Sequence, residues 1–157
     1  MAGRQEWVLL AYRMPREPSS PRITVWRRLR KLGAVQIVDG LVALPADART
    51  KEQLEWVADQ AVEAGGEATI WLARLGSAKQ ERDLAARMAA EVTEAYQAVI
   101  DEVAELRLAP DAVPQRTLSR LRRELRRIGQ RDYFPPPTRD AAHTAVDGLA
   151  EVVGANT

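Results

Sequence analysis

Residues 7–45 read WVLLAYRMPREPSSPRITVWRRLRKLGAVQIVDGLVALP, and the order of segments within this stretch decides the fold. The apolar run at 7–12 predicts a strand, and both alternating sets of its side chains are apolar. We therefore expect both faces of its sheet to be covered, one by the helices predicted at 20–32 and 50–64 and the other by the C-terminal helices or by a second subunit. Ser20 followed by Pro21 is typical of a helix start and predicts a helix that runs to about Leu32.

The following residues supply the other elements of a small sheet domain. Asp39-Gly40 is a two-residue hairpin signal, and Thr50 with Gln53 forms a capping box. With the apolar pattern, these signals predict strands at 34–38, 41–45 and 67–73 and a helix from about 50 to 64. The order β-α-β-β-α-β is typical of a ferredoxin-like sandwich, so we predict an α+β fold with such a domain at 5–75.

A helical extension is predicted over residues 77–154. Ser77 and Gln80 form a second capping box, ahead of a long acidic helix whose apolar residues recur every three or four positions. The proline-containing stretch 109–114 ends that helix. The remaining predicted elements are a basic helix at about 115–129 and a last helix, capped by Thr138, that runs to about 153.

The composition excludes several classes of chemistry. The 157 residues include no cysteine and one histidine, His143. Thiolate metal sites, cysteine nucleophiles and multi-histidine metal centres are therefore excluded, and we expect no enzyme activity, no metal and no cofactor. No apolar run approaches the roughly 18 residues of a membrane span, so we expect a cytoplasmic protein with no membrane partner.

Charge is strongly segregated along the chain, although the formal net charge is only +1. Residues 22–31 carry five positive charges and no acid, and residues 116–131 carry seven arginines against Glu124 alone. Residues 77–106 carry seven acids against three cations. Charge blocks of this kind favour an interaction surface over uniform solvation.

Both basic segments are predicted to be amphipathic helices. At 100° per residue, Val25, Trp26, Leu29 and Leu32 fall on one side of the first helix, and Arg27, Arg28, Arg30 and Lys31 fall on the other. Guanidinium groups match phosphate oxygens in bidentate pairs, and each phosphate that they neutralise releases counterions. The candidate DNA-binding residues are Arg22, Arg27, Arg28, Arg30, Lys31, Arg116, Arg120, Arg123 and Arg127.

Three interpretations of the two basic helices stay open. In the first they bind nucleic acid, in the second the 116–131 helix pairs with the acidic 77–106 helix or a partner, and in the third they are ordinary exposed surface. The 22–31 helix is the better candidate for nucleic acid, because no acidic neighbour in the sequence neutralises it.

The four tryptophans lie within the predicted sandwich domain. Trp7, Trp26, Trp56 and Trp71 fall on apolar faces or at the ends of predicted elements, and we interpret them as core residues. His143 lies on the predicted last helix and is interpreted as a surface or packing residue.

The stretch from 7 to 45 resembles the N-terminal domain of the chromate-resistance regulator ChrB. In that family a first strand ending in Tyr is followed by PREPS, here at 15–19, by a VWRRLRxLGAV helix, here at 25–35, and by a DG hairpin. The similarity continues through LEWVADQAVEAGGEATIWLA at 54–73 and, more weakly, LRRELRRIGQRDYFPPP at 121–137.

This resemblance implies a DNA-associated transcriptional regulator linked to chromate resistance. In the family this region precedes a sensing domain. The present chain ends at Thr157, so we expect it to lack this C-terminal sensing domain and either to act alone or to work with a separately encoded sensor. The alternative is a protein-interaction module in metal or oxyanion stress that docks such a sensor.

The opening segments also resemble the PaaX regulators and the Cas2 nucleases, which share a ferredoxin-like core. In Cas2 an aspartate that helps to bind metal follows the aromatic residue of the first strand. The matching position here, after Tyr12, is Arg13. A cation cannot bind Mg²⁺, so we expect nucleic-acid binding without metal-dependent cleavage. We also expect a homodimer, because DNA regulators commonly bind paired half-sites.

Overall fold

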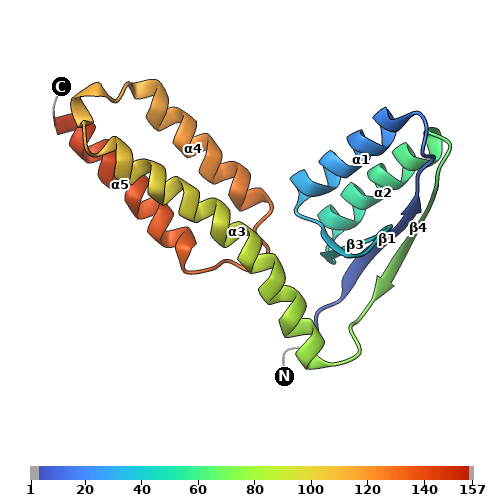
Figure 1. The fold of residues 1–157 in the computed structure, drawn as a ribbon. Helices are drawn as coiled ribbons and strands as arrows, with labels where there is room; N and C mark the ends of the chain where they lie inside the picture. The colour runs from blue at the N-terminus through green and yellow to red at the C-terminus, as the bar shows by residue number, and fades with distance from the viewer. Residues whose placement is uncertain (1–3, 156–157) are drawn as a thin grey trace. The chain divides into compact units, whose positions relative to one another are not determined.

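The computed structural model describes residues 4–155 and confirms the α+β class (Figure 1). The elements, in chain order, are β1 (Trp7–Arg13), α1 (Ser19–Leu32), β2 (Val35–Val38), β3 (Leu41–Pro45), α2 (Ala48–Glu63), β4 (Glu67–Ala73), α3 (Ala78–Leu106), a short 3₁₀ turn η1 (Pro110–Ala112), α4 (Gln115–Gln130) and α5 (Thr138–Ala155). The chain divides into two compact units between Leu84 and Ala85, inside α3.

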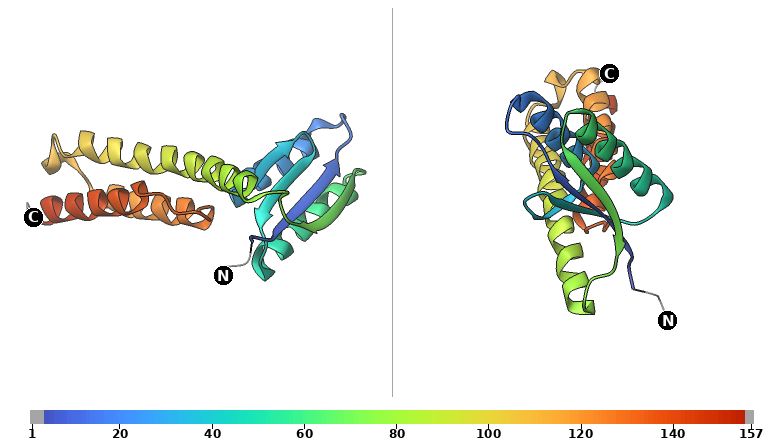
Figure 2. Two further views of the ribbon diagram at one scale, coloured as in Figure 1. Left: turned by 90° about the horizontal axis from the view of Figure 1, so that it is seen from below. Right: turned by 90° about the vertical axis from the view of Figure 1, so that its right-hand side faces the viewer.

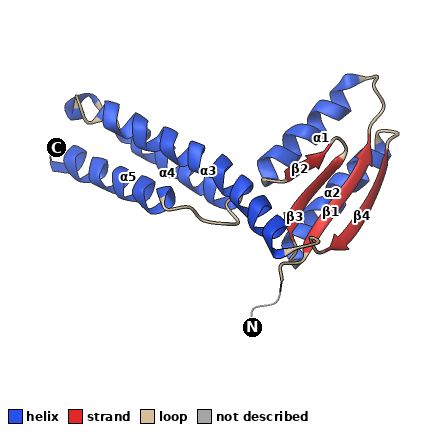
Figure 3. Ribbon diagram, turned by 60° about the horizontal axis from the view of Figure 1, so that its bottom comes forward, coloured by secondary structure: helices blue, strands red, loops and turns tan. Residues whose placement is uncertain are grey.

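The first unit contains a four-stranded antiparallel sheet in the order β2-β3-β1-β4. The strands form one twisted layer, and α1 and α2 lie side by side on one side of it (Figures 2 and 3). β1 is an inner strand of this sheet. It pairs with β3 on one side and with all seven residues of β4 on the other.

Alternate residues of β1 point to opposite faces of the sheet. Tyr12 lines a groove together with residues of α1, so the set Val8, Leu10 and Tyr12 faces the helices. Val8 and Leu10 are fully buried there. The other buried residues of the first unit are Trp7, Val25, Leu29, Val35, Val42, Ala43, Leu44, Thr50, Leu54, Val57, Ala61 and Leu84.

The hairpin between β2 and β3 forms at Asp39-Gly40, as predicted. Gly40 has a φ of 79°, and its carbonyl oxygen accepts a hydrogen bond of 2.8 Å from the backbone N–H of Tyr12. A Cβ atom at Gly40 would lie 2.7 Å from the Tyr12 carbonyl oxygen. Glycine is therefore required here for both conformation and space.

The predicted start of α1 is wrong. α1 begins at Ser19 after Pro18, and no side chain caps it, so Pro21 becomes the third helical residue. Proline is tolerated there because the first-turn N–H groups have no partner within the helix. At the other end, Gly33 takes the left-handed conformation with a φ of 80° and ends the helix as predicted.

The predicted capping box of α2 is also wrong, because the helix begins earlier. Asp47 is the N-cap residue, and its carboxylate accepts a hydrogen bond from the Thr50 backbone N–H at 2.8 Å. The Thr50 hydroxyl in turn accepts a hydrogen bond from the Asp47 backbone N–H at 3.0 Å. The acidic side chain of Asp47 is the better acceptor at a positive helix end, so it displaces the predicted Thr50/Gln53 pair.

The two other predicted caps have different outcomes. Ser77 Oγ accepts a hydrogen bond from the Gln80 backbone N–H at 3.2 Å, which confirms this residue as the cap before α3. Thr138, in contrast, is the first residue of α5, and its buried hydroxyl makes no hydrogen bond within residues 4–155. The predicted role of Thr138 as an N-cap is wrong.

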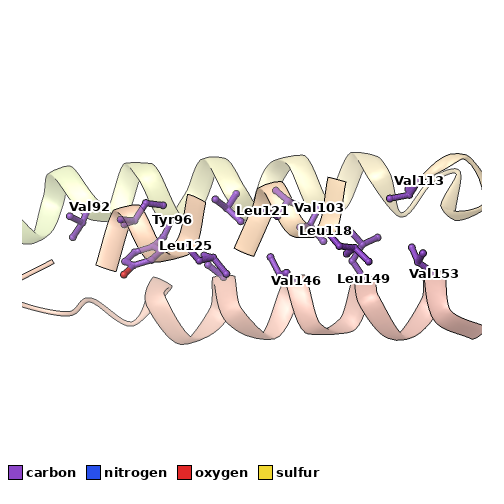
Figure 4. Packing of buried hydrophobic residues seen from close by; sticks show 13 residues of the cluster. Val92, Tyr96, Val103, Val113, Leu118, Leu121, Leu125, Val146, Leu149 and Val153 are labelled. Carbon is purple, nitrogen blue, oxygen red and sulfur yellow. The ribbon is translucent and has the colours of Figure 1, made fainter. Parts of the chain in front are cut away.

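The second unit packs α4, α5 and the C-terminal part of α3 around one apolar core (Figure 4). The predicted amphipathic character of α4 is confirmed, because Leu118, Leu121, Leu125 and Ile128 are all buried on one side of it. The remaining members of the core are Val92, Tyr96, Val99, Val103, Val113, Ala142, Val146, Leu149 and Val153.

One polar bond lies within this core. The Tyr96 hydroxyl donates a hydrogen bond of 2.9 Å to the Asp132 carboxylate, which links α3 to the segment after α4. Tyr96 is fully buried. Burial, followed by the hydrogen bond and the charge of Asp132, raises the pKa of Tyr96 to about 12. The phenol is therefore a neutral donor across the physiological range.

The prediction that all four tryptophans belong to the core is wrong for three of them. Trp7 is 1% exposed, whereas Trp26, Trp56 and Trp71 are 50%, 59% and 58% exposed. Trp26 lies about 100° around α1 from Val25, and Trp56 about 200° around α2 from the buried Leu54. Neither position faces the sheet.

Within residues 4–155 both faces of the sheet are partly uncovered at β4, and the expected cover by a second subunit stays a prediction. Trp71 pairs with Leu9 in the register and Leu72 pairs with Val8, so these two side chains point to opposite faces. Both are more than half exposed, at 58% and 52%. The physical reason is that β4 is an edge strand, with a neighbour on one side only within residues 4–155.

Candidate nucleic-acid interface

The orientation of α1 follows from its apolar residues. Val25 and Leu29 are 2% and 3% exposed, and they fix one side of the helix against the domain. The cations therefore lie on the flanks and on the outer side of the helix. Arg22, Arg27, Arg30 and Lys31 are exposed, and Arg28 is half-buried.

The positive charges of α1 form no ion pair with an acid within residues 4–155. Among residues 4–155, no carboxylate oxygen lies within 4.0 Å of a charged nitrogen of Arg22, Arg27, Arg28, Arg30 or Lys31. The five charges of this helix therefore remain available to an anionic partner.

Two of these arginines stack on exposed tryptophan rings. The Arg30 guanidinium carbon lies 5.1 Å from the centre of the Trp26 ring, and that of Arg28 lies 5.7 Å from the centre of the Trp56 ring. Such cation–π contacts orient the planar guanidinium while its N–H groups stay free to donate. We call the five cations of α1 with Trp26 and Trp56 the α1–α2 surface.

A groove of about 550 Å³ opens beside this surface, between α1 and the β2–β3 hairpin. Its walls combine cationic, aromatic and polar groups: Arg22, Trp26 and Arg27 from α1, with Tyr12, Gln36 and Asp39 from the sheet. Burial, and then the negative charge of Asp39, raise the pKa of Tyr12. The groove thus places hydrogen-bond donors and the indole ring of Trp26 beside the positive charges of Arg22 and Arg27.

The basic residues of α4 divide into paired and unpaired groups. Arg120 contacts Glu102 of α3 at 2.8 Å, and Arg127 contacts Glu124 within α4 at 3.2 Å. The hydrogen bond to Glu102 raises the pKa of Arg120. Arg116 and Arg123 are exposed and have no carboxylate within 4.0 Å among the described residues.

These contacts bear on the interpretation in which the basic helix pairs with the acidic helix. Only Arg120 reaches an acid of α3 among the ion pairs within residues 4–155. Exposed ion pairs of this kind contribute little to stability. Internal pairing therefore accounts for one of the four candidate arginines of α4, and an ion pair within α4 accounts for Arg127.

Sequence reasoning missed the aromatic part of the site. The apolar pattern predicts that Trp26 and Trp56 lie in the core, and it gives no indication that Tyr12, Gln36 and Asp39 belong to the site. A helical projection of α2 contains a usable signal, because Trp56 falls opposite the buried Leu54. The sheet residues of the groove carry no comparable signal, since only the folded hairpin brings them to α1.

Residues 4–155 contain no group of three or more His, Asp or Glu side chains placed to hold a metal ion. Arg13, the position at which Cas2 has an aspartate, forms an exposed ion pair of 3.2 Å with Glu67. Within the same range, no helix has the length and apolar character needed to cross a membrane.

Comparisons with known proteins identify a family that matches most of the chain. A sequence model of the family described as "Protein ChrB, N-terminal" matches residues 22–155, which include most of α1 and all of α4, the two basic helices. No curated protein and no solved structure matches. The family match covers most of the chain, confirms the resemblance found in the sequence and links the protein to chromate-resistance regulation. The chain belongs to the family of ChrB N-terminal domains.

Proposed function

We propose that this protein is a DNA-binding regulator linked to chromate resistance and that the α1–α2 surface contacts the phosphates of duplex DNA. The observation that carries the proposal is the set of five cations on α1 with no carboxylate partner among the described residues. Membership of the ChrB N-terminal family supports the regulatory role.

The chemistry of the surface fits a phosphate backbone. Arg22, Arg27 and Lys31 are exposed single charges, whereas Arg28 and Arg30 are held against indole rings. Guanidinium groups that are held in place lose less side-chain entropy when they bind phosphate bidentately. Phosphate contacts of this kind position a protein on DNA without selecting a sequence.

The unpaired arginines of α4 are a second proposed contact. Arg116 and Arg123 are exposed and carry the same chemistry as the cations of α1. Arg120 and Arg127 contribute less in this proposal, because each has a carboxylate within hydrogen-bond distance.

We also propose that the first unit is a ferredoxin-like sandwich. The element order β-α-β-β-α-β and the strand order β2-β3-β1-β4 support this assignment. Both helices lie on one side of the sheet (Figure 3), as such a sandwich requires.

The test is the affinity of the full chain for a fluorescent DNA duplex, measured by anisotropy at one low salt concentration. The double variant Arg27→Gln/Arg30→Gln is expected to bind at least about tenfold more weakly, because each lost charged hydrogen bond costs about 1.5–3 kcal/mol. The matched control is Arg82→Gln, an exposed arginine of α3 outside the proposed surface.

Equal affinity of all three proteins would contradict DNA contact through α1. If the double variant then loses binding to a separate sensor protein while the control keeps it, the alternative function is favoured, in which the charged helices dock that protein.

A further inference from the structure

The two edges of the sheet are built differently. β2 has four residues, and its register with β3 shifts between Gln36 and Val38. β4 has seven residues, and all seven pair with β1 without any shift. Short and irregular edge strands resist pairing with another chain, whereas long and regular ones invite it. β2 is protected in this sense and β4 is not.

The composition of β4 adds to this contrast. The strand reads EATIWLA and contains no proline, no lysine and no charge after Glu67. Trp71 and Leu72 are 58% and 52% exposed on its two faces. Figure 3 shows β4 at the outer edge of the sheet. The backbone groups on its outer side have no strand partner within residues 4–155.

We infer that the β4 edge pairs with β4 of a second copy of this chain, antiparallel and about a two-fold axis. Pairing centred on Ile70 places Trp71 opposite Thr69 of the partner strand and Leu72 opposite Ala68. Large side chains then lie opposite small ones on both faces, and Ile70 meets its own copy. A two-fold interface must be complementary to itself in this way.

The charges at the ends of β4 select the same arrangement. Glu67 begins the strand, and Arg74 follows its last residue. Antiparallel pairing brings each strand's acidic end near the partner's basic end, whereas parallel pairing would bring like charges together. The result is one continuous eight-stranded sheet with the helices of both copies on the same side. This inference does not depend on DNA binding.

The first test is the oligomeric state of the full chain, measured by sedimentation velocity over a concentration series. The wild-type chain is expected to dimerise. Trp71→Lys is expected to weaken the dimer by at least about tenfold, because two lysines then approach each other across the axis and the indole contact is lost. The matched control is Val38→Lys, which changes a side chain that is 60% exposed on the other edge strand.

The outcomes separate the possible occupants of the edge. Loss of the dimer in Trp71→Lys with an unchanged Val38→Lys supports the inference. A wild-type chain that stays monomeric overturns it and leaves the edge to a strand of a different protein. A dimer that Trp71→Lys does not weaken also overturns it, because the copies then meet elsewhere.

A second variant tests the register and does not depend on how Trp71→Lys folds. The chain contains no cysteine, so a single introduced thiol is unique. Ile70→Cys is expected to give a disulfide-linked dimer under mild oxidation, because residue 70 faces its own copy in the proposed register. Val38→Cys is the control and should stay monomeric on a non-reducing gel. Equal cross-linking of the two variants, or none in Ile70→Cys, contradicts the register.

Discussion

Trp56 and Trp7 are the same residue type in opposite environments. Trp7 is 1% exposed in the core, whereas Trp56 is 59% exposed beneath the guanidinium of Arg28. We predict that Trp7→Ala lowers the free energy of unfolding by about 3–5 kcal/mol, and that Trp56→Ala changes it by less than about 0.5 kcal/mol.

Urea denaturation of the two variants measures these free energies, and DNA titration measures the affinity of the stable one. Trp56→Ala is expected to bind DNA more weakly, because Arg28 loses the ring that holds it. A Trp56 variant that unfolds like the Trp7 variant would contradict the surface role.

Tyr96 gives a prediction about pH. Its pKa is raised from 10.0 to about 12 in the folded protein by burial and by Asp132. The unfolded chain therefore releases the Tyr96 proton first, and the stabilisation by this group is complete below pH 10 and is lost as the pH rises toward 12. Tyr96→Phe at neutral pH is expected to cost about 1.5–3 kcal/mol, because the hydrogen bond to a carboxylate is lost.

The measurement is the urea midpoint of both proteins from pH 8 to pH 12. The gap between wild type and Tyr96→Phe should be constant up to pH 10 and then narrow. A gap that stays constant through the whole range would show that the Tyr96 proton is not linked to folding.

At the scale of residues, the sequence indicates much of the site but not its aromatic part. The helical projection separates Val25 and Leu29 from the cations, which the structure confirms. It also places Trp26 on the apolar side, and this is wrong, because Trp26 is 50% exposed. The exposed tryptophans could not be recognised from their apolar character. A large ring is buried only where a neighbouring element covers it, and that depends on contacts distant in the chain.

At the scale of elements, two glycines test the backbone of the fold. Gly129 lies near the end of α4, and a Cβ atom there would have no neighbour within 4 Å. Gly129→Ala is expected to raise the free energy of unfolding by about 0.5–1 kcal/mol, because alanine restricts the unfolded chain. Gly40→Ala is expected to lower it by more than about 1 kcal/mol, because the positive φ and the close Tyr12 oxygen exclude a side chain.

Thermal or urea unfolding of the two variants beside wild type measures both effects. The two substitutions are expected to change the free energy of unfolding in opposite directions. Destabilisation by Gly129→Ala would show that the end of α4 does not have the described helical backbone.

The positions of the elements are predicted well by periodicity, but their starts are not. β3 and β4 have the predicted bounds, whereas α1 and α2 begin at Ser19 and Ala48, before the predicted starts. Helix starts depend on which nearby side chain captures the free N–H groups. At α2 the N-cap residue is Asp47 and not Thr50, and a sequence pattern does not distinguish such neighbouring N-cap candidates well.

At the scale of the whole molecule, the order of the elements can be predicted from the sequence, but the exposed edge cannot. The segment order predicts a small sheet domain followed by helices, and the structure agrees. The exposure of Trp71 and Leu72 follows from the place of β4 at the end of the strand order. Strand order is set by pairings between distant segments, which local periodicity does not encode.

The central claim is that the cations of α1 neutralise phosphates, and the salt dependence of DNA affinity tests it most directly. The logarithm of the association constant should fall linearly with the logarithm of salt concentration, by about 0.9 per phosphate neutralised. Arg22→Gln/Arg27→Gln/Arg30→Gln is expected to make this slope shallower by about 2.7, since each arginine accounts for one phosphate. A slope that is the same in the wild type and in this triple variant, or a wild-type affinity that does not weaken as salt rises, would contradict the claim.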